Sequence, residues 1–336
     1  MEKKKGLSLQ TILTIAGLAL VYLLAFLLDR IPGVPIMLTT VLRKGAIYSL
    51  VAVSMNLLNG FTGLFSLGQA GFMLVGAYTF AAINISSGIR STVYQYYDPL
   101  LNFSLTETLQ GALGNTAGTV LGVFISLLLA GLLAAVLAYL IGLPVLKLKS
   151  DYLAIATLGF AEILRAIFQW QTLGKVTNGA NILKGYPTFA DFNITNASGK
   201  VLFRLSAVVP ILLAGICIFL IVLLINSSYG RAFKAIRDDE IAAEAMGVNL
   251  AKHKSLSFVI SSFFAGVSGA LFAMFATTVQ AKVFTSAMTY EILLIVVIGG
   301  IGSVSGSCIA SFLYIACSES VSYTHLRAHE TLMNLV

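Results

Sequence analysis

Charged residues are scarce in this chain of 336 residues. Only 10% of them are Asp, Glu, Lys or Arg, whereas 58% are hydrophobic. A soluble domain of this length needs about 25% charged residues to cover its surface, so the composition excludes a soluble globular protein. The net charge of +7 fits basic residues that flank membrane segments and meet anionic lipid headgroups. The composition therefore predicts a protein that crosses a lipid bilayer many times.

The residues that build metal centres and catalytic sites are also few. Cys217, Cys308 and Cys317 lie in apolar segments without CxxC spacing, which argues against a disulfide framework or a metal site. The sequence holds neither an HExxH motif nor a Ser/His/Asp set. It also lacks a GxxxxGK[ST] phosphate-binding loop, so we expect no cofactor on this chain and no enzyme activity. No basic run is interleaved with aromatic residues, so nucleic acid is not an expected partner.

Apolar runs fill most of the length. About eight are long enough to cross roughly 30 Å of hydrocarbon, and that length predicts helices rather than barrel strands. They cover residues 9–28, 36–58, 64–83, 118–143, 152–170, 206–225, 256–278 and 288–317. The predicted fold is an all-α, polytopic bundle of transmembrane helices in one domain, residues 1–317, with some of the helices interrupted.

Basic residues suggest how the bundle is oriented. Lys3, Lys4 and Lys5 precede the first run, which is too long for a signal peptide and has no small-residue cleavage site. We expect an uncleaved anchor with its N-terminus in the cytoplasm. Alternation then places the polar loops 84–117 and 171–205 outside. The cytoplasmic side receives Lys147, Lys149, Arg231, Lys234, Arg237, Lys252 and Lys254.

One charged stretch lies on the expected cytoplasmic side, between two apolar runs. Residues 228–247 read SYGRAFKAIRDDEIAAEAMG. Ser227 or Ser228 is suited to cap a first short helix, and Asp238 to cap a second one with acidic residues in its first turn. Gly247 is suited to end that second helix in the left-handed conformation. The pattern predicts a helical hairpin within loop 227–255, with its charges outward and Met246 among the residues that pack.

Two interpretations of this hairpin are open. A solvated connector needs no partner, because loops are commonly polar and exposed. The small residues Ala242, Ala243 and Ala245, followed by Gly247, instead favour the close approach of another protein surface. We expect the second interpretation to hold.

Small and polar residues inside the apolar runs are ambiguous. The glycines 299, 300, 302 and 306 do not belong to a dinucleotide-binding motif, because no βαβ unit fits a lipid-length apolar run. A helix break or close helix packing explains them better. A second series contains Gly63, Gly68, Gly71 and Gly76 together with Ser66 and Gln69. It is explained equally well by helix packing and by a polar lining for a solute path.

Glu162 and Arg165 lie in the apolar run 152–170, about one helical turn apart on one face. Ionisable residues are costly within a membrane span, and they mark either a transport pathway or an internal ion pair. We predict an ion pair, with a pathway role as the alternative.

Several stretches together resemble the branched-chain amino-acid permease family of ABC importers. Besides the hairpin, the similar segments are residues 63–79 (GLFSLGQAGFMLVGAYT), 150–165 (SDYLAIATLGFAEILR), 263–273 (FFAGVSGALFA) and 291–306 (EILLIVVIGGIGSVSG). The resemblance extends from about residue 56 to 306, and the hairpin, which resembles the coupling loop of these permeases, is its most specific part.

The resemblance implies a permease subunit in the inner (plasma) membrane of a bacterial cell that imports leucine, isoleucine or valine. Its partners would be two cytoplasmic ABC ATPases, a second homologous permease and an extracytoplasmic solute-binding protein. The implied ATPase-coupling residues are Arg231, Ala232, Arg237, Asp238, Asp239, Glu240, Ala243, Glu244, Ala245 and Gly247. Related permeases for urea, short amides or other amino acids are an alternative. A secondary transporter that needs no ATPase is another.

The last residues differ from the rest. Residues 318–336 (SESVSYTHLRAHETLMNLV) are polar, whereas the resemblance implies further apolar helix at this point. We predict that they are foreign to the fold and come from a truncated or spliced reading frame. A native, solvated tail is the alternative.

Overall fold

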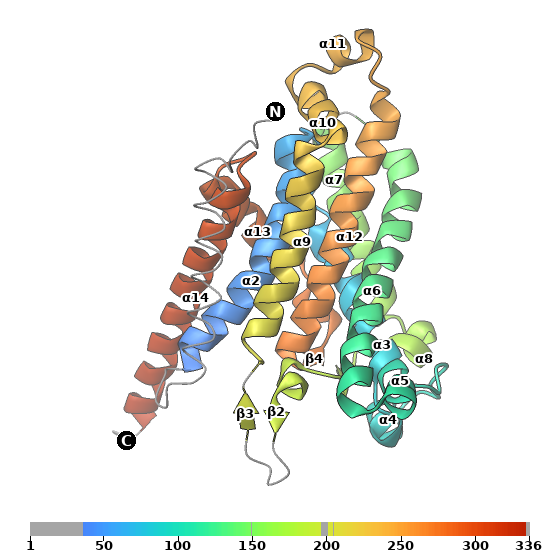
Figure 1. Cartoon of the computed structure of the whole chain (residues 1–336), viewed down its shortest axis with the longest axis vertical. Coiled ribbons are helices and arrows are strands. Elements are labelled where there is room, and N and C mark those ends of the chain that lie inside the picture. The colour runs from blue at the N-terminus through green and yellow to red at the C-terminus, as the bar shows by residue number, and fades with distance from the viewer. Residues whose placement is uncertain (1–35, 149, 196–200, 204, 334–336) are drawn as a thin grey trace, which may run out of the picture.

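The computed structural model describes residues 36–148, 150–195, 201–203 and 205–333. Its long helices form a bundle (Figure 1), as the apolar runs predict. They are α2 (Ile36–Asn56), α3 (Gln69–Asn84), α6 (Asn115–Val145), α7 (Ser150–Gln169), α9 (Val208–Asn226), α12 (Leu250–Ala276), α13 (Ser286–Gly299) and α14 (Val304–Met333). The predicted first span, residues 9–28, lies outside the described residues.

The shorter elements gather at the two ends of the bundle. One end, here called the hairpin end, carries α10 (Ser228–Asp238) and α11 (Glu240–Ala245). The opposite end, called the loop end, carries α4 (Ser87–Val93), α5 (Leu105–Leu113), α8 (Gly174–Thr177) and the strands β1 (Leu183–Lys184), β2 (Ile194–Thr195), β3 (Val201–Phe203) and β4 (Thr278–Val279). The predicted loops 84–117 and 171–205 therefore lie together, opposite the hairpin.

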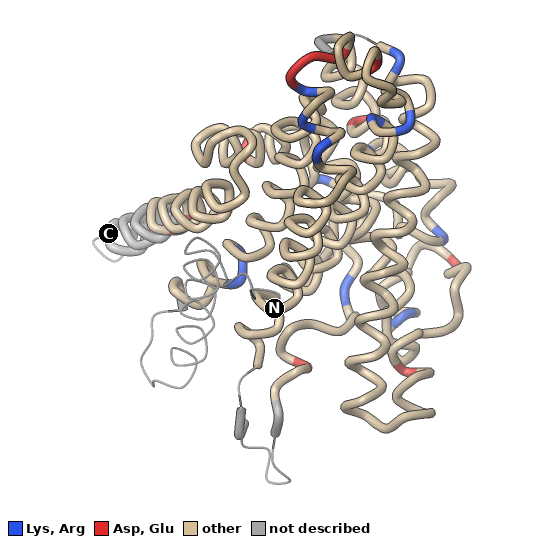
Figure 2. The backbone as a smooth tube through the Cα atoms, turned by 45° about the horizontal axis from the view of Figure 1, so that its top comes forward, with Lys and Arg blue, Asp and Glu red and all other residues tan. Residues whose placement is uncertain are grey.

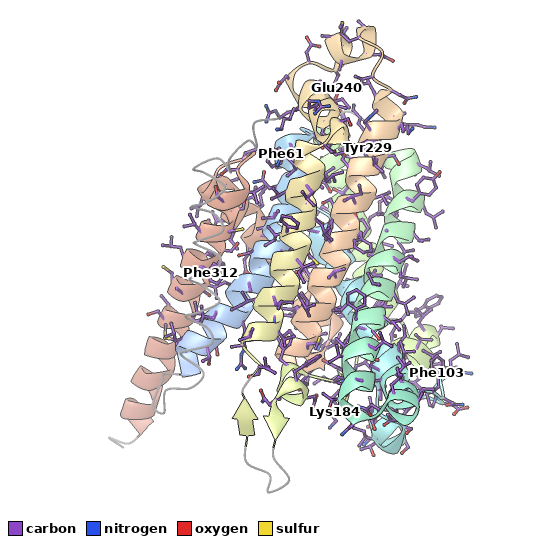
Figure 3. All side chains as sticks on the ribbon, viewed as in Figure 1. Phe61, Phe103, Lys184, Tyr229, Glu240 and Phe312 are labelled. Atoms are coloured by element: carbon purple, nitrogen blue, oxygen red, sulfur yellow. The ribbon has the colours of Figure 1, made fainter. Side chains whose placement is uncertain are left out.

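Two short antiparallel ladders tie the loop end together. Strand β1 pairs with β4, with Leu183 opposite Val279, and β2 pairs with β3, with Ile194 opposite Phe203. Since β4 directly follows α12, the first ladder joins the long loop after α7 to the end of a central helix. Figure 3 labels Lys184 and Phe103 at this end, and Phe61, Tyr229 and Glu240 at the other.

The core lies where α3 meets α12. Nearly all of α3 is buried within this one chain, and glycines let the two backbones touch. A Cβ on Gly76 would lie 1.9 Å from the carbonyl oxygen of Gly266, and one on Gly269 would lie 2.0 Å from that of Met73. Such close contact between small residues is typical of membrane helix pairs. By contrast α6 and α9 expose large apolar side chains over much of their length, as helices facing lipid do.

Two predicted spans differ from the structure. Among the described residues, six helices are long and apolar enough to cross a membrane. The run 64–83 does not form one such helix, because α3 begins only at Gln69 and follows a π-helix at Leu57–Phe61. The run 288–317 is two helices, α13 and α14, joined by a turn in which Gly300 and Gly302 have φ of +93° and +84°. Of the four glycines predicted either to break or to pack a helix, Gly300 and Gly302 thus form the turn that ends α13.

The polar C-terminal residues continue α14 without interruption as far as Met333. In this segment of α14, the Glu319 carboxylate forms an ion pair with the Lys44 ammonium on α2, at 2.6 Å. That residues 318–336 come from a truncated or spliced reading frame stays a prediction.

Candidate functional site: a charged hairpin and the helix breaks beneath it

The hairpin gathers charge at one end of a bundle that has little elsewhere (Figure 2). Its first helix, α10, is separated from α9 by the extended residue Ser227. Gly230 lets the two helices pack closely, because a Cβ there would be 2.0 Å from the Ile225 carbonyl oxygen. Phe233 and Ile236 face inward and are fully buried. The Phe233 ring also meets the His253 ring edge-on, with centroids 6.3 Å apart. The first helix of the hairpin thus packs against the bundle.

The second helix, α11, has a cap at each end. The Asp239 carboxylate accepts hydrogen bonds from the backbone N–H groups of Ile241 (2.8 Å) and Ala242 (3.0 Å). The prediction that Asp238 caps this helix is therefore wrong by one residue, because Asp238 ends α10 and pairs instead with Arg237 at 2.8 Å.

Gly247 ends α11 in the left-handed conformation, with φ of +87°, as predicted. The N–H of Val248 donates to the Ala243 carbonyl and that of Gly247 to the Glu244 carbonyl, at 3.0 and 2.9 Å. This pair of bonds is the Schellman arrangement. A Cβ on Gly247 would meet no atom within 4 Å, so the surface beside this glycine is open.

The hairpin presents apolar side chains to the exterior as well as charges. Ile241 is 82% exposed and Met246 is 84% exposed. The expectation that Met246 packs against the bundle is therefore wrong. Sequence reasoning also missed Ile241, although an isoleucine between acidic residues on a short solvated helix is a signal of a contact surface. Apolar residues this exposed, rimmed by charge, are typical of a surface that another protein covers.

The predicted coupling residues lie together but do not all face outward. The exposed ones are Arg231, Arg237, Asp238, Asp239, Glu240, Glu244, Ala245 and Gly247. Ala243 is buried and Ala232 is partly buried. Glu240 forms a 2.6 Å ion pair with Lys254 on α12, which ties the start of α11 to the bundle.

Arg237 points from α10 toward the broken end of α2. Its Nη1 donates a 3.2 Å hydrogen bond to the carbonyl oxygen of Gly60, inside the π-helix. Its backbone also lies against Gly63, where an added Cβ would be 3.2 Å from the Arg237 Cα. The hairpin is therefore in direct contact with the segment that separates α2 from α3.

Asn56 joins that segment to the turn between α13 and α14. Its side chain is fully buried, and its Nδ2 lies 3.0 Å from the Ser303 carbonyl, 2.8 Å from Ser307 Oγ and 3.4 Å from the Gly300 carbonyl. Its Oδ1 accepts from the Gly302 N–H at 2.7 Å. Sequence reasoning missed Asn56, because its partners lie more than 240 positions away and no local pattern marks it.

Ser66 and Gln69 are buried between helices of this chain, each only 2% exposed. The Gln69 amide donates to Ser261 Oγ on α12 at 2.8 Å, and the Ser66 N–H donates to Asn59 Oδ1 at 3.1 Å. These contacts hold the start of α3 in place. A role for these two residues in a solute path stays a prediction.

Glu162 and Arg165 form an ion pair on α7, with Oε2 at 2.7 Å from Nε and 2.6 Å from Nη2. The other carboxylate oxygen accepts the Ser286 N–H at the start of α13, at 3.1 Å. About a third of each side chain is exposed. A pair only partly covered by its own chain, on a helix that crosses lipid, is typical of a face that lines water or a second subunit.

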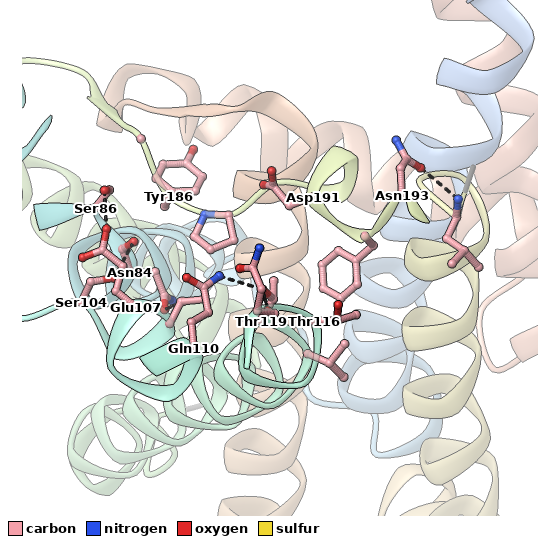
Figure 4. A pocket seen from close by; sticks show the side chains of 17 residues that line it. Asn84, Ser86, Ser104, Glu107, Gln110, Thr116, Thr119, Tyr186, Asp191 and Asn193 are labelled. Atoms are coloured by element: carbon pink, nitrogen blue, oxygen red, sulfur yellow. Dashed lines mark hydrogen bonds between the residues drawn. The ribbon is translucent and has the colours of Figure 1, made fainter. Parts of the chain in front are cut away.

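A polar cavity of about 610 Å³ lies at the loop end (Figure 4). Its walls come from α5, the start of α6 and the loop around Tyr186. The described residues that line it include two carboxylates, Glu107 and Asp191, but no Lys or Arg. Burial alone raises the pKa of Glu107, but hydrogen bonds that Ser86 and Ser87 donate, together with the nearby Arg90 charge, outweigh it and lower that pKa below its usual range. Glu107 therefore carries a negative charge at neutral pH.

Comparison with known proteins supports the resemblance. A family model described as "Branched-chain amino acid transport system / permease component" matches residues 37–335. The permease proteins LivM of a high-affinity branched-chain amino acid transport system, from Salmonella typhimurium and Escherichia coli, are each 32% identical over 81% of this chain and 61% of their own. A probable LivM from Methanocaldococcus jannaschii is 26% identical over 83% of this chain and 79% of its own. The chain thus spans about three-fifths of the two bacterial relatives. No solved structure matches.

Proposed function

Because this multi-pass membrane protein belongs to the family of branched-chain amino-acid transport permeases, we propose that it is the membrane-spanning subunit of an ABC importer for these amino acids. Its relatives are transport subunits rather than enzymes. ATP would be hydrolysed by two separate cytoplasmic ATPases. A second permease subunit would complete the path, and a solute-binding protein would deliver the amino acid. The chain would lie in the inner membrane of a bacterial cell, with its N-terminus in the cytoplasm.

The hairpin is the observation that carries the proposal. It combines a seated base, Phe233 and Ile236, with a free tip that exposes Ile241 and Met246. A solvated connector gains nothing from exposed apolar side chains, whereas a groove on another protein would bury them. At roughly 25 cal/mol per Å² of apolar surface removed from water, two such side chains contribute on the order of a few kcal/mol. That suits a docking element whose contacts must form and transmit force.

The loop end is suited to receive the solute. Two carboxylates, Glu107 and Asp191, are among the described residues that line its cavity, so it favours partners that bring positive charge. The partly exposed Glu162–Arg165 pair lies on the surface of α7, where a second permease would cover it. These two features support the binding-protein and second-permease partners, which the proposal requires.

Two rival functions make different predictions. A permease for urea or short amides would share the hairpin, so it is distinguished by competition between unlabelled urea and labelled leucine for uptake. A secondary transporter would take up its solute without ATPases, and it has no need for a capped hairpin with exposed apolar side chains. The hairpin therefore favours the ATP-driven class.

Gly247→Asp tests the docking surface. The substitution adds a charge where the structure has open space, beside Met246, and it strains the backbone because φ is +87°. The permease should insert normally, but co-expressed ATPases should no longer copurify, and solute-stimulated ATP hydrolysis should fall at least tenfold. Gly247→Ala is the matched control, because it carries the same strain without the charge and should keep most of the activity.

A second variant, Met246→Asp, places a charge on the tip without backbone strain. It should weaken ATPase binding as Gly247→Asp does. Normal copurification and stimulated hydrolysis in both aspartate variants would remove the main support for the proposed function.

A further inference from the structure

Two helix breaks meet beneath the hairpin. In the first, α2 ends at Asn56 and passes through the π-helix Leu57–Phe61 and a non-helical stretch before α3 begins at Gln69. In the second, the turn at residues 300–303 separates α13 from α14. Interrupted helices in membrane proteins are stable only where neighbouring groups satisfy the freed backbone atoms.

Asn56 satisfies the second break from within the first. One amide side chain spans the turn, bonding the carbonyl oxygens of Gly300 and Ser303 and the N–H of Gly302. Gly60 must be small for this to happen, since a Cβ there would lie 1.9 Å from Asn56 Oδ1 and 2.5 Å from the Gly302 nitrogen. The two breaks are therefore held as a single unit, and neither moves without the other.

Arg237 is the point where the hairpin holds this unit. Its guanidinium donates to the Gly60 carbonyl at 3.2 Å, and a Cβ built on Gly302 would lie 3.5 Å from Nη1. The one side chain thus reaches both breaks. A hydrogen bond from a charged donor is stronger than a neutral one. Lys234 adds a weaker contact, with its ammonium 5.8 Å from the centre of the Phe61 ring.

We propose that Arg237 is a positioning residue that transmits movement of the hairpin to the paired helix breaks held by Asn56. This inference rests on the proposed function, because the ATPases supply the movement. A pull on α10 displaces the Gly60 carbonyl, Asn56 carries the displacement to the turn at residues 300–303, and α13 and α14 change their angle. The Arg237 side chain is 39% exposed, so replacing it removes the link without opening a cavity in the core.

The experiment reports on the turn itself. Ile301, 61% exposed in that turn, is replaced by cysteine and labelled with an environment-sensitive fluorophore, in a protein whose three native cysteines are changed to serine. The cysteine variant is co-expressed with a second permease subunit and two ATPases, purified, labelled and placed in lipid nanodiscs. Fluorescence is recorded before and after a non-hydrolysable ATP analogue is added, and ATPase copurification is measured on the same samples.

Relative to the amount of ATPase that copurifies, Arg237→Ala should lose at least four-fifths of the nucleotide-dependent fluorescence change. Solute transported per ATP should fall at least fivefold. Arg237→Lys keeps a charged donor and should recover part of both signals. Lys252→Ala is the matched control, because it removes a positive charge from an exposed position at the hairpin end that is not among the predicted coupling residues, and it should behave as the parent protein does.

An unchanged fluorescence response in Arg237→Ala with the ATPases bound would overturn the inference and leave the proposed function standing. A response lost equally in Lys252→Ala would overturn it too, because charge rather than the link to Gly60 would then be responsible. If the ATPases fail to copurify with the parent protein, the proposed function fails and the inference falls with it.

Discussion

Replacing Gly76 by alanine should destabilise the permease more than any comparable change at a surface glycine. The new Cβ would lie 1.9 Å from the Gly266 carbonyl oxygen, whereas ordinary contacts begin near 3.4 Å, so α3 and α12 must separate by about 1.5 Å. Helix α12 has no room to retreat, because a Cβ on Gly266 would itself lie 2.6 Å from Ala134 on α6. Overpacking of this kind costs about 1–3 kcal/mol.

Thermal unfolding of the detergent-solubilised permease measures this cost. At roughly 2–4 °C per kcal/mol, Gly76→Ala should lower Tm by about 2–12 °C. Gly159→Ala is the matched control, because Gly159 is also inside a helix but an added Cβ meets nothing within 4 Å. Its Tm should stay the same or rise, since alanine favours helix over glycine by up to about 1 kcal/mol. Equal Tm values for the two variants would refute the close α3–α12 packing.

The ion pair on α7 predicts that the effects of substituting its two residues do not add. Glu162→Gln and Arg165→Met should each lower Tm or uptake more than the double variant does, because each single change leaves an unpaired charge. Additive losses in that double-mutant cycle would show independent roles. The lowered pKa of Glu107 predicts that its carboxylate stabilises the loop end at neutral pH and that this stabilisation is lost as pH falls through the folded-state pKa. Glu107→Gln should therefore lower Tm at pH 7 and by less at pH 4, and a constant difference would contradict the assignment.

The hairpin was predictable from its residues because its signals are local. A capping aspartate, an acidic first turn and a terminal glycine lie within ten positions of one another. The structure shifts the cap from Asp238 to Asp239 and exposes Met246. The ion pair of Glu162 and Arg165 was likewise readable, because helical spacing brings them together on one face.

The helix breaks were not readable in the same way. Apolar composition predicts a span, but it does not say whether the span is continuous. The start of α3 is displaced to Gln69 because Thr157 accepts the Leu67 N–H at 2.9 Å from another helix, a contact with no trace in the local sequence. Asn56 is the extreme case, since an asparagine in an apolar helix has meaning only once the turn at residues 300–303 lies beside it.

The burial of α3 has a consequence for how the protein is made. At 16 residues this helix is about 24 Å long, shorter than the roughly 30 Å of hydrocarbon, and it leaves the ribosome long before its main neighbour. The glycines that receive it belong to α12, which begins at Leu250. Until that helix is synthesised, α3 lacks the backbone contacts at Gly266 and Gly269, so the centre of the bundle is completed late although its first helix is made early. Nascent chains halted before residue 250 should therefore be the ones that membrane proteases recognise.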